Sequence, residues 1–196
     1  LPFNNVDTIS YEVTDTIFSR DDNSTAQYYL NVAGYSSSGP TANGSSYEFG
    51  NWYETVNADT ATSITVVFGA NTIVGTNIQG KVYADDGTTL LGSTAFYTIL
   101  AGDVGSFPNF PTTTLSLTAP LALSDTSNYI ITIADYSGTD TAMSIIGIND
   151  GHVFGTSFLI YDAGLATIPE TPFVRLNLVM PADPCLITPL SATVST

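Results

Sequence analysis

The sequence predicts an all-β fold, an antiparallel β-sandwich of jelly-roll-like architecture with roughly ten to twelve short strands. Three observations lead to this prediction. Strand-forming residues dominate, with Thr, Ile and Val abundant beside 11 Tyr and 10 Phe, whereas the Lys, Glu and Gln that cover helix surfaces are scarce. Apolar and polar residues alternate with a period of two in many stretches, and none sustains the helical period of about 3.6. Turn-forming Asn-Gly and Asp-Gly pairs separate these stretches.

Each alternating stretch is expected to turn one set of side chains toward the core and the other toward solvent. In chain order, the clearest expected strands lie at residues 8–13, 64–68, 78–83, 114–117, 131–133 and 173–179. The best hairpin candidate joins residues 81–84 to 89–91 through a turn at Asp85, Asp86 and Gly87. Glycine tolerates the positive φ that such a tight turn requires.

One β-sandwich domain is expected over residues 1–180, because no change in composition interrupts the pattern. Prolines punctuate residues 181–196, which we interpret as a linker or the start of a following domain. The chain begins at Leu1 without Met or a leader, so we expect a removed signal peptide or a piece of a longer protein. The lone cysteine, Cys185, excludes a disulfide framework within the chain.

The charge of the chain excludes several kinds of partner. Lys and Arg together number 3 against 18 Asp and Glu, which gives a formal net charge of -15. A phosphate-binding surface needs clustered cations, so nucleic acid and anionic membranes are poor partners. Apolar runs are only a few residues long, so no membrane insertion is expected. The expected partners are neighbouring domains of a longer chain, with glycans or further copies of the same chain as additional candidates.

Aromatic residues gather in one stretch and predict a ligand-binding surface. Tyr47, Trp52 and Tyr53 are able to stack on the C–H faces of sugar rings, while neighbouring Asn and Asp would bind hydroxyls. Against this, Tyr and Trp that alternate in strands are usually part of a sandwich core or of cross-strand pairs. A carbohydrate-binding module of an extracellular enzyme is therefore an alternative function.

Two glutamates, Glu48 and Glu54, flank residues 49–53, which we interpret as a hairpin turning near Gly50. A glycoside hydrolase needs two carboxylates about 5–10 Å apart across a cleft, and a tight hairpin would bring this pair together. The E-x-D-x-x-E strand signature common in jelly-roll glycanases is absent, so a hydrolase is the weaker alternative. The single histidine, His152, lies beside a glycine turn without a G-x-S-x-G motif, so no catalytic residue is predicted.

Oxygen-rich loops make calcium the one expected cofactor. The candidate ligands are Asp21 and Asp22 in one loop and Asp85 and Asp86 in another. Ca²⁺ takes about six to eight oxygen ligands, which the loops of β-sandwiches commonly supply. Asp also forms turns for its own sake, so both interpretations stay open. Separately, Arg175 stands in an apolar strand and is predicted to pair with a carboxylate.

Several stretches of the sequence carry a family resemblance: residues 44–49, 61–66, 80–90, 115–117, 120–123, 129–133 and 172–178. In this order they resemble a module of large secreted cell-surface proteins that gliding Gram-negative bacteria export by type IX secretion. The resemblance implies that the chain is part of a longer protein, and it supplies no catalytic residues. It also implies O-glycosylation at Thr8, Thr16, Thr60 and Thr141. Each of these threonines is the middle residue of a triplet in which Asp comes first and an apolar residue or Thr comes last.

The expected function is a non-catalytic structural or adhesive module of a secreted, O-glycosylated protein. An oxygen-rich, cation-poor surface resists aggregation and suits an extracellular or outer-cell-surface location. The resemblance points to the same location. The carbohydrate-binding module and the glycoside hydrolase remain the alternatives to be tested.

Overall fold

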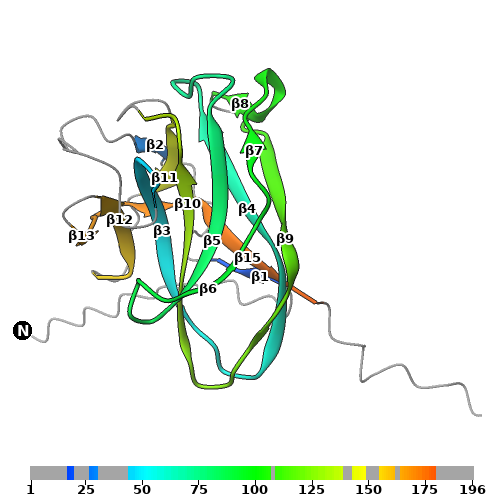
Figure 1. The fold of residues 1–196 in the computed structure, drawn as a ribbon. Coiled ribbons are helices and arrows are strands. Elements are labelled where there is room, and N and C mark those ends of the chain that lie inside the picture. The colour runs from blue at the N-terminus through cyan, green and yellow to red at the C-terminus, as the bar shows by residue number, and fades with distance from the viewer. Residues whose placement is uncertain are drawn as a thin grey trace, which may run out of the picture.

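The computed structural model describes residues 17–19, 27–30, 44–106, 109–138, 143–148, 155–161 and 164–179, with the backbone alone at residues 27–30, 146 and 148. In these residues two largely antiparallel sheets pack against each other, which confirms the predicted all-β sandwich (Figure 1). The one helical element of the described residues is the 3₁₀ turn η1, Ala101–Asp103. Residues 181–196 lie outside this part, so the domain boundary at residue 180 stays a prediction.

The first sheet contains eight of the described strands. They are β1 (Ile17–Phe18), β2 (Gln27–Leu30), β4 (Asp59–Gly69), β8 (Val104–Gly105), β9 (Thr112–Leu123), β11 (Ile145–Ile148), β14 (Thr171–Pro172) and β15 (Val174–Leu178). The order across the sheet is β1-β15-β4-β11-β14, and β9 and β8 pair with β4 while β2 pairs with β11.

The second sheet contains the other seven described strands. They are β3 (Tyr47–Glu54), β5 (Asn77–Ala84), β6 (Leu90–Ser93), β7 (Tyr97–Thr98), β10 (Asn128–Asp135), β12 (Ser157–Tyr161) and β13 (Gly164–Thr167). The order is β13-β12-β3-β10-β5-β6, with β7 beside β5. The strands outnumber the prediction because several of them are only two residues long.

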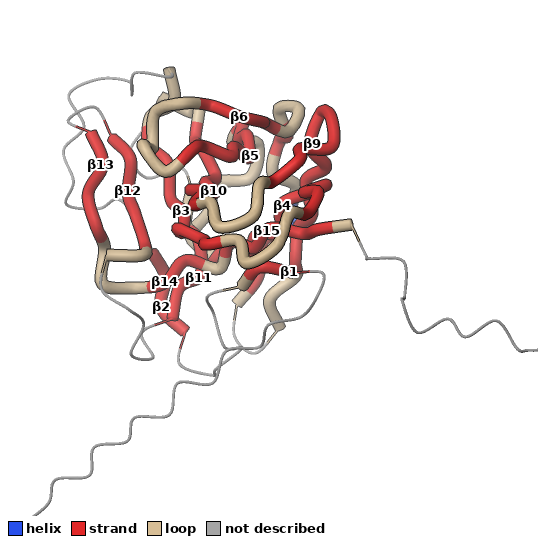
Figure 2. Tube along the Cα trace, turned by 90° about the horizontal axis from the view of Figure 1, so that it is seen from below, coloured by secondary structure: helices blue, strands red, loops and turns tan. Residues whose placement is uncertain are grey.

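The main core lies between the two sheets, and the alternation along each strand fills it. Buried side chains come from the second sheet at Tyr47, Phe49, Tyr53, Val82, Ile131 and Ile133, and from the first sheet at Ile64, Val66, Leu115, Val174 and Leu176. Figure 2 shows the two layers from below, with β3, β10 and β5 in one and β4 and β15 in the other. These positions follow the period-two pattern of the sequence, because successive side chains of a strand point to opposite faces.

Gly50 lies inside a continuous strand, so the predicted turn near this residue is wrong. It faces Thr132 of β10 on one side and Phe158 of β12 on the other. A Cβ atom at Gly50 would collide with the backbone carbonyl oxygen of Ile131. The glycine is therefore needed for the close approach of β10 and not for a reversal of the chain.

The predicted hairpin at residues 81–91 is confirmed. Strands β5 and β6 pair with Tyr83 opposite Leu90, and Gly87 in the turn has a φ of 66°. The backbone N–H of Ala84 donates to the carbonyl of Thr89 at 2.9 Å. This turn brings Asp85 to the outer side of the second sheet, where its carboxylate contacts Trp52.

Polar side chains, one buried and one exposed, tie the two sheets together. The side-chain amide of Asn51, on β3, donates to the carbonyls of Pro172 at 2.8 Å and Val174 at 3.1 Å in the first sheet. At another place Thr118 Oγ1, on β9, donates to the carbonyl of Ser93 at 2.9 Å, at the end of β6. Hydrogen bonds between sheets fix their relative position in a way that apolar packing alone does not.

Candidate functional site

The outer face of the second sheet carries a compact group of polar side chains, here called the Glu48 cluster. Its members are Ser45, Glu48, Lys81, Tyr83 and Thr132. Tyr47 and Phe49 point into the main core, so Glu48 between them points to the opposite face. Strand pairing sets Thr132 of β10 directly opposite Lys81 of β5, which collects the cluster over three neighbouring strands.

The carboxylate of Glu48 accepts hydrogen bonds from all the other members. Lys81 Nζ donates to Oε1 at 2.7 Å and Ser45 Oγ donates to the same oxygen at 2.8 Å. Thr132 Oγ1 donates to Oε2 at 2.7 Å, and the Tyr83 hydroxyl lies 3.1 Å from both oxygens. Glu48 is fully buried, and Lys81 is only 2% exposed. The acceptor capacity of the carboxylate is thus used within the fold.

Glu48 favours the charged form of the buried Lys81. Burial alone would lower the Lys81 pKa, but the charge and hydrogen bond of Glu48 outweigh it and raise the pKa above its ordinary value. Burial, reinforced by the same negative charge, raises the pKa of Tyr83, whose hydroxyl stays protonated and able to donate. Removing one member of a buried ion pair costs about 3–5 kcal/mol, because the remaining charge loses its counter-charge.

A second apolar cluster lies beside the Glu48 cluster on the same outer face. This outer apolar cluster comprises Tyr83, Ile130, Phe158 and Ile160, with the partly buried Trp52 packed against it. The β5–β6 turn approaches it closely, since a Cβ at Gly87 would lie 3.3 Å from Leu165 Cδ1 and 3.5 Å from Ile130 Cδ1. The outer face of this sheet therefore carries a second buried region, which consists of the Glu48 cluster and the outer apolar cluster and is here called the second interior.

Trp52 lies at the border of this second interior. Its indole Nε1–H donates to Asp85 Oδ1 at 2.7 Å, and the Asn128 amide lies 3.5 Å from Asp85 Oδ2. The exposed Glu54 follows on the same face of β3, opposite Asn128 of β10. An aromatic ring, two carboxylates and an amide thus share one region of the surface.

The predicted aromatic surface of Tyr47, Trp52 and Tyr53 does not form, because the three side chains lie on opposite faces of β3. Tyr47 and Tyr53 are buried in the main core. The Tyr47 hydroxyl donates to the carbonyl of Met143 at 2.9 Å, and the Tyr53 hydroxyl donates to that of Val174. Both tyrosines therefore belong to the sandwich core, which is the other interpretation that the sequence left open. Of the three aromatic residues, only Trp52 faces outward.

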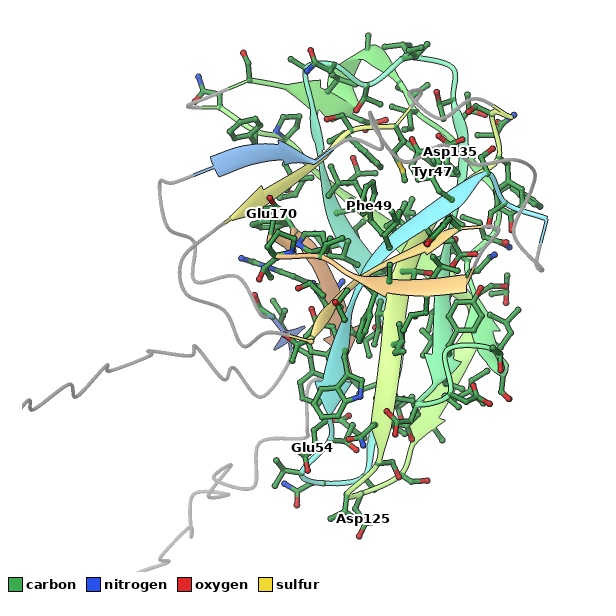
Figure 3. All side chains as sticks on the ribbon, turned by 90° about the vertical axis from the view of Figure 1, so that its left-hand side faces the viewer. Tyr47, Phe49, Glu54, Asp125, Asp135 and Glu170 are labelled. Carbon is green, nitrogen blue, oxygen red and sulfur yellow. The ribbon has the colours of Figure 1, made fainter. Side chains whose placement is uncertain are left out.

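The predicted juxtaposition of Glu48 and Glu54 is also wrong. Both lie on one continuous strand, six positions apart, which separates them by about 20 Å at the usual rise of an extended chain. Figure 3 shows Glu54 at the opposite end of β3 from Tyr47. This separation exceeds the spacing of a glycosidase pair, and Glu48 is enclosed.

The two described aspartates of the calcium prediction have protein partners. Asp85 binds the indole of Trp52, whereas Asp86 Oδ1 accepts the backbone N–H groups of Thr88 at 2.8 Å and Thr89 at 2.7 Å. Hydrogen bonds from Thr89 and Thr88 lower the pKa of Asp86 to about 2. Across the described residues no group of three or more His, Cys, Asp or Glu side chains is arranged to hold a metal. Asp21 and Asp22 lie outside them, so calcium stays a prediction.

Of the four predicted glycosylation sites, Thr60 is the one that falls within the described residues, since Thr8, Thr16 and Thr141 lie outside them. It is half-buried near the start of β4, where its backbone N–H donates to Asp59 Oδ1 at 2.6 Å. His152 and Cys185 also fall outside.

The side chain of Arg175 is half-buried and lies over the ring of Phe173, with 4.0 Å between the guanidinium carbon and the ring centre. The predicted carboxylate partner of Arg175 stays a prediction.

A second buried carboxylate, besides Glu48, lies at the far end of β10. Asp135 is fully buried opposite Tyr47, and Figure 3 shows the two labelled side chains close together. Its Oδ1 accepts the backbone N–H of Ser137 at 2.6 Å, while Oδ2 has no hydrogen-bond partner in the described structure. Burial raises the pKa of Asp135 and so favours its protonated form.

Sequence reasoning missed four of the five members of the Glu48 cluster, namely Ser45, Lys81, Tyr83 and Thr132. A usable signal was present for Lys81, because a cation within a strand pattern and in so acidic a chain needs a buried partner. The pairing of β3, β10 and β5, which brings Thr132 and Lys81 to Glu48, follows from the fold and not from any local motif.

No family model matches the chain, and no curated protein matches it. Within the described residues, no helix has the length and apolar character needed to cross a lipid bilayer.

Proposed function

We propose that the protein is a non-catalytic structural or adhesive module of a secreted cell-surface protein. The Glu48 cluster is the observation that carries this proposal. Its carboxylate, ammonium and hydroxyl groups are those best suited to acid–base chemistry, yet they are enclosed and bonded to one another. Their work is to join β3, β5 and β10, which is a structural task.

The surface of the first sheet supports an extracellular setting. Strand β9 exposes Thr112, Thr114, Ser116 and Thr118 on alternate positions, and Thr114 exchanges a hydrogen bond of 2.9 Å with Thr65 of β4. Uncharged hydroxyl groups stay hydrated without promoting association, and the net charge of -15 keeps molecules apart. O-glycosylation at sites such as Thr60, and export by type IX secretion, belong to the same proposal.

The location is tested on intact cells of the native producer. Brief protease treatment of the cell surface should release peptides of this module, and deletion of the module should reduce attachment of the cells to a solid support. The matched control is a cytosolic marker, which should stay intact during the treatment. Recovery of the native polypeptide only from the cytosol would refute the proposal.

Carbohydrate binding is a second candidate, favoured by the position of Trp52 beside Asp85 and Asn128. It is compatible with an adhesive module, since an adhesin needs a ligand. A glycoside hydrolase built on Glu48 and Glu54 is not proposed, because the two carboxylates do not face each other.

A further inference from the structure

We propose that Trp52, Glu54, Asp85 and Asn128 form a binding site for a neutral glycan, here called the Trp52 site. This inference rests on the adhesive function proposed above and names the chemical class of its ligand. The four residues come from β3, the β5–β6 turn and the start of β10.

Strand geometry places the four side chains in one patch. Trp52 and Glu54 are two positions apart on β3 and so face the same side, about 7 Å apart along the strand. Asn128 is the cross-strand partner of Glu54, about 5 Å away in the neighbouring strand. Asp85 reaches the same patch from the turn, as its hydrogen bond to Trp52 requires.

The indole of Trp52 is held in place before any ligand arrives. It packs on the outer apolar cluster, and its N–H is fixed by Asp85 Oδ1 at 2.7 Å. The ring nevertheless remains partly exposed. A rigid, partly exposed aromatic ring is suited to stack on the C–H face of a sugar, because little conformational entropy is lost on binding.

The polar groups around the ring have hydrogen-bonding capacity left. The contact between Asn128 Nδ2 and Asp85 Oδ2 is 3.5 Å, at the outer limit for a hydrogen bond. The carboxylate oxygen is therefore a weakly engaged acceptor and the amide a weakly engaged donor. Together with the exposed Glu54 they offer acceptors and a donor for the hydroxyl groups of a sugar.

The charge of the patch selects a neutral ligand. Glu54, Asp85 and the adjoining Asp86 are carboxylates, and Lys81 of the same sheet is bound to Glu48. A uronic acid, a sialic acid or a phosphorylated sugar would meet like charge there. Hydroxyl-rich, uncharged chains such as glucans and mannans meet no such repulsion.

Trp52 provides its own probe, because it is the sole tryptophan of the chain. The experiment titrates the full chain with neutral cello-, manno- and laminari-oligosaccharides and with oligogalacturonate, while tryptophan emission is recorded. We expect a saturable change with at least one neutral oligosaccharide and none with oligogalacturonate. No saturable change with any neutral oligosaccharide up to millimolar concentration would overturn the site, and equal binding of oligogalacturonate would overturn the ligand class.

Variants then locate the binding, measured by calorimetry. Asn128→Ala should weaken binding about tenfold, the effect of one lost hydrogen bond of roughly 1.4 kcal/mol, and it leaves the outer apolar cluster intact. Trp52→Ala should abolish binding, with circular dichroism to verify its fold. Thr114→Ala, on the outer face of the other sheet, is the matched control and should bind as the wild type does. Wild-type affinity in Asn128→Ala would overturn the assignment.

The two proposals fail in different ways. A silent titration of a module that protease treatment finds on the cell surface would refute the Trp52 site and leave the proposed function standing. A saturable titration of a protein confined to the cytosol would refute the extracellular function while leaving the site intact.

Discussion

Both faces of the second sheet bury side chains, but the two buried regions are built on different chemistry. The inner face sets Tyr47, Phe49 and Tyr53 against the first sheet, and their rings fill the main core. The outer face, which would normally be solvated, encloses Glu48 with Lys81 beside an apolar cluster. Burial in this protein therefore does not distinguish the inside of the sandwich from its outside.

The two faces differ in how well each tolerates substitution of its buried side chains. An apolar core tolerates exchanges that conserve volume, because dispersion contacts have little directionality. An enclosed ion pair does not, because each charge needs its own partner at the right distance. The outer face should thus be the more sensitive of the two to single polar substitutions.

The largest effect is expected at Gly50, where the two faces share a backbone. Gly50→Ala introduces a Cβ into the carbonyl of Ile131 and should destabilise by on the order of 4 kcal/mol or more, with loss of the folded state as the limit. Gly102→Ala is the matched control, because a Cβ at Gly102 meets nothing within 4 Å. Urea denaturation followed by circular dichroism measures both. Equal stability of the two variants would show that β10 shifts freely.

Single changes in the ion pair come next. Lys81→Met and Glu48→Gln should each lower the free energy of unfolding by about 3–5 kcal/mol, because each leaves a buried charged or donor group uncompensated. Glu54→Gln, on the same strand but exposed, should change it by less than about 0.5 kcal/mol. A small effect at Lys81 would mean that the outer face admits water.

Asp135 tests the same comparison on the inner face of the sheet. It is a buried carboxylate that has no cation beside it in the described residues. Its pKa is raised in the folded state, so its contribution is fully favourable below the unfolded pKa and is lost as the pH rises through the folded pKa. Asp135→Asn should therefore stabilise the protein at neutral pH by about 1–3 kcal/mol, since the neutral amide avoids the cost of burying a carboxyl group that ionises readily in the unfolded chain.

Thermal unfolding at neutral and acidic pH tests the Asp135 prediction. The advantage of Asp135→Asn should disappear in acid, where the wild-type carboxyl is protonated. Asp125→Asn, at an exposed turn, is the control and should show no such advantage. A variant less stable than the wild type at neutral pH would contradict the prediction.

The smallest effect is expected at the exposed Asp86, whose pKa shift has the opposite sign. Hydrogen bonds from Thr89 and Thr88 lower its pKa to about 2 from an ordinary 3.8. Its stabilising contribution is present above the unfolded value and is lost as the pH falls through the folded one. Asp86→Asn should lower the melting temperature slightly at neutral pH and not below about pH 2. Identical melting curves at every pH would show that the turn does not depend on this carboxylate.

The sequence was sufficient for the sandwich and for the β5–β6 hairpin, because strand alternation and Asp-Gly turns are local signals. It failed at Gly50, since a glycine in a strand and a glycine in a turn look alike until the neighbouring strand is known. It also placed Tyr47 and Tyr53 with Trp52, although alternation along one strand puts them on opposite faces. The Glu48 cluster escaped prediction because its members meet through pairing of β3, β10 and β5, which are far apart in the chain.

The coupling between Glu48 and Lys81 tests the central claim most directly. The free energy of unfolding is measured for the wild type, Glu48→Gln, Lys81→Met and the double variant. If this pair organises the second interior, the double variant should lose less stability than the two single variants lose together. The expected coupling energy is about 2 kcal/mol or more. The combination of Glu54→Gln with Lys81→Met should be additive. Additive losses for Glu48 and Lys81 themselves would contradict the account.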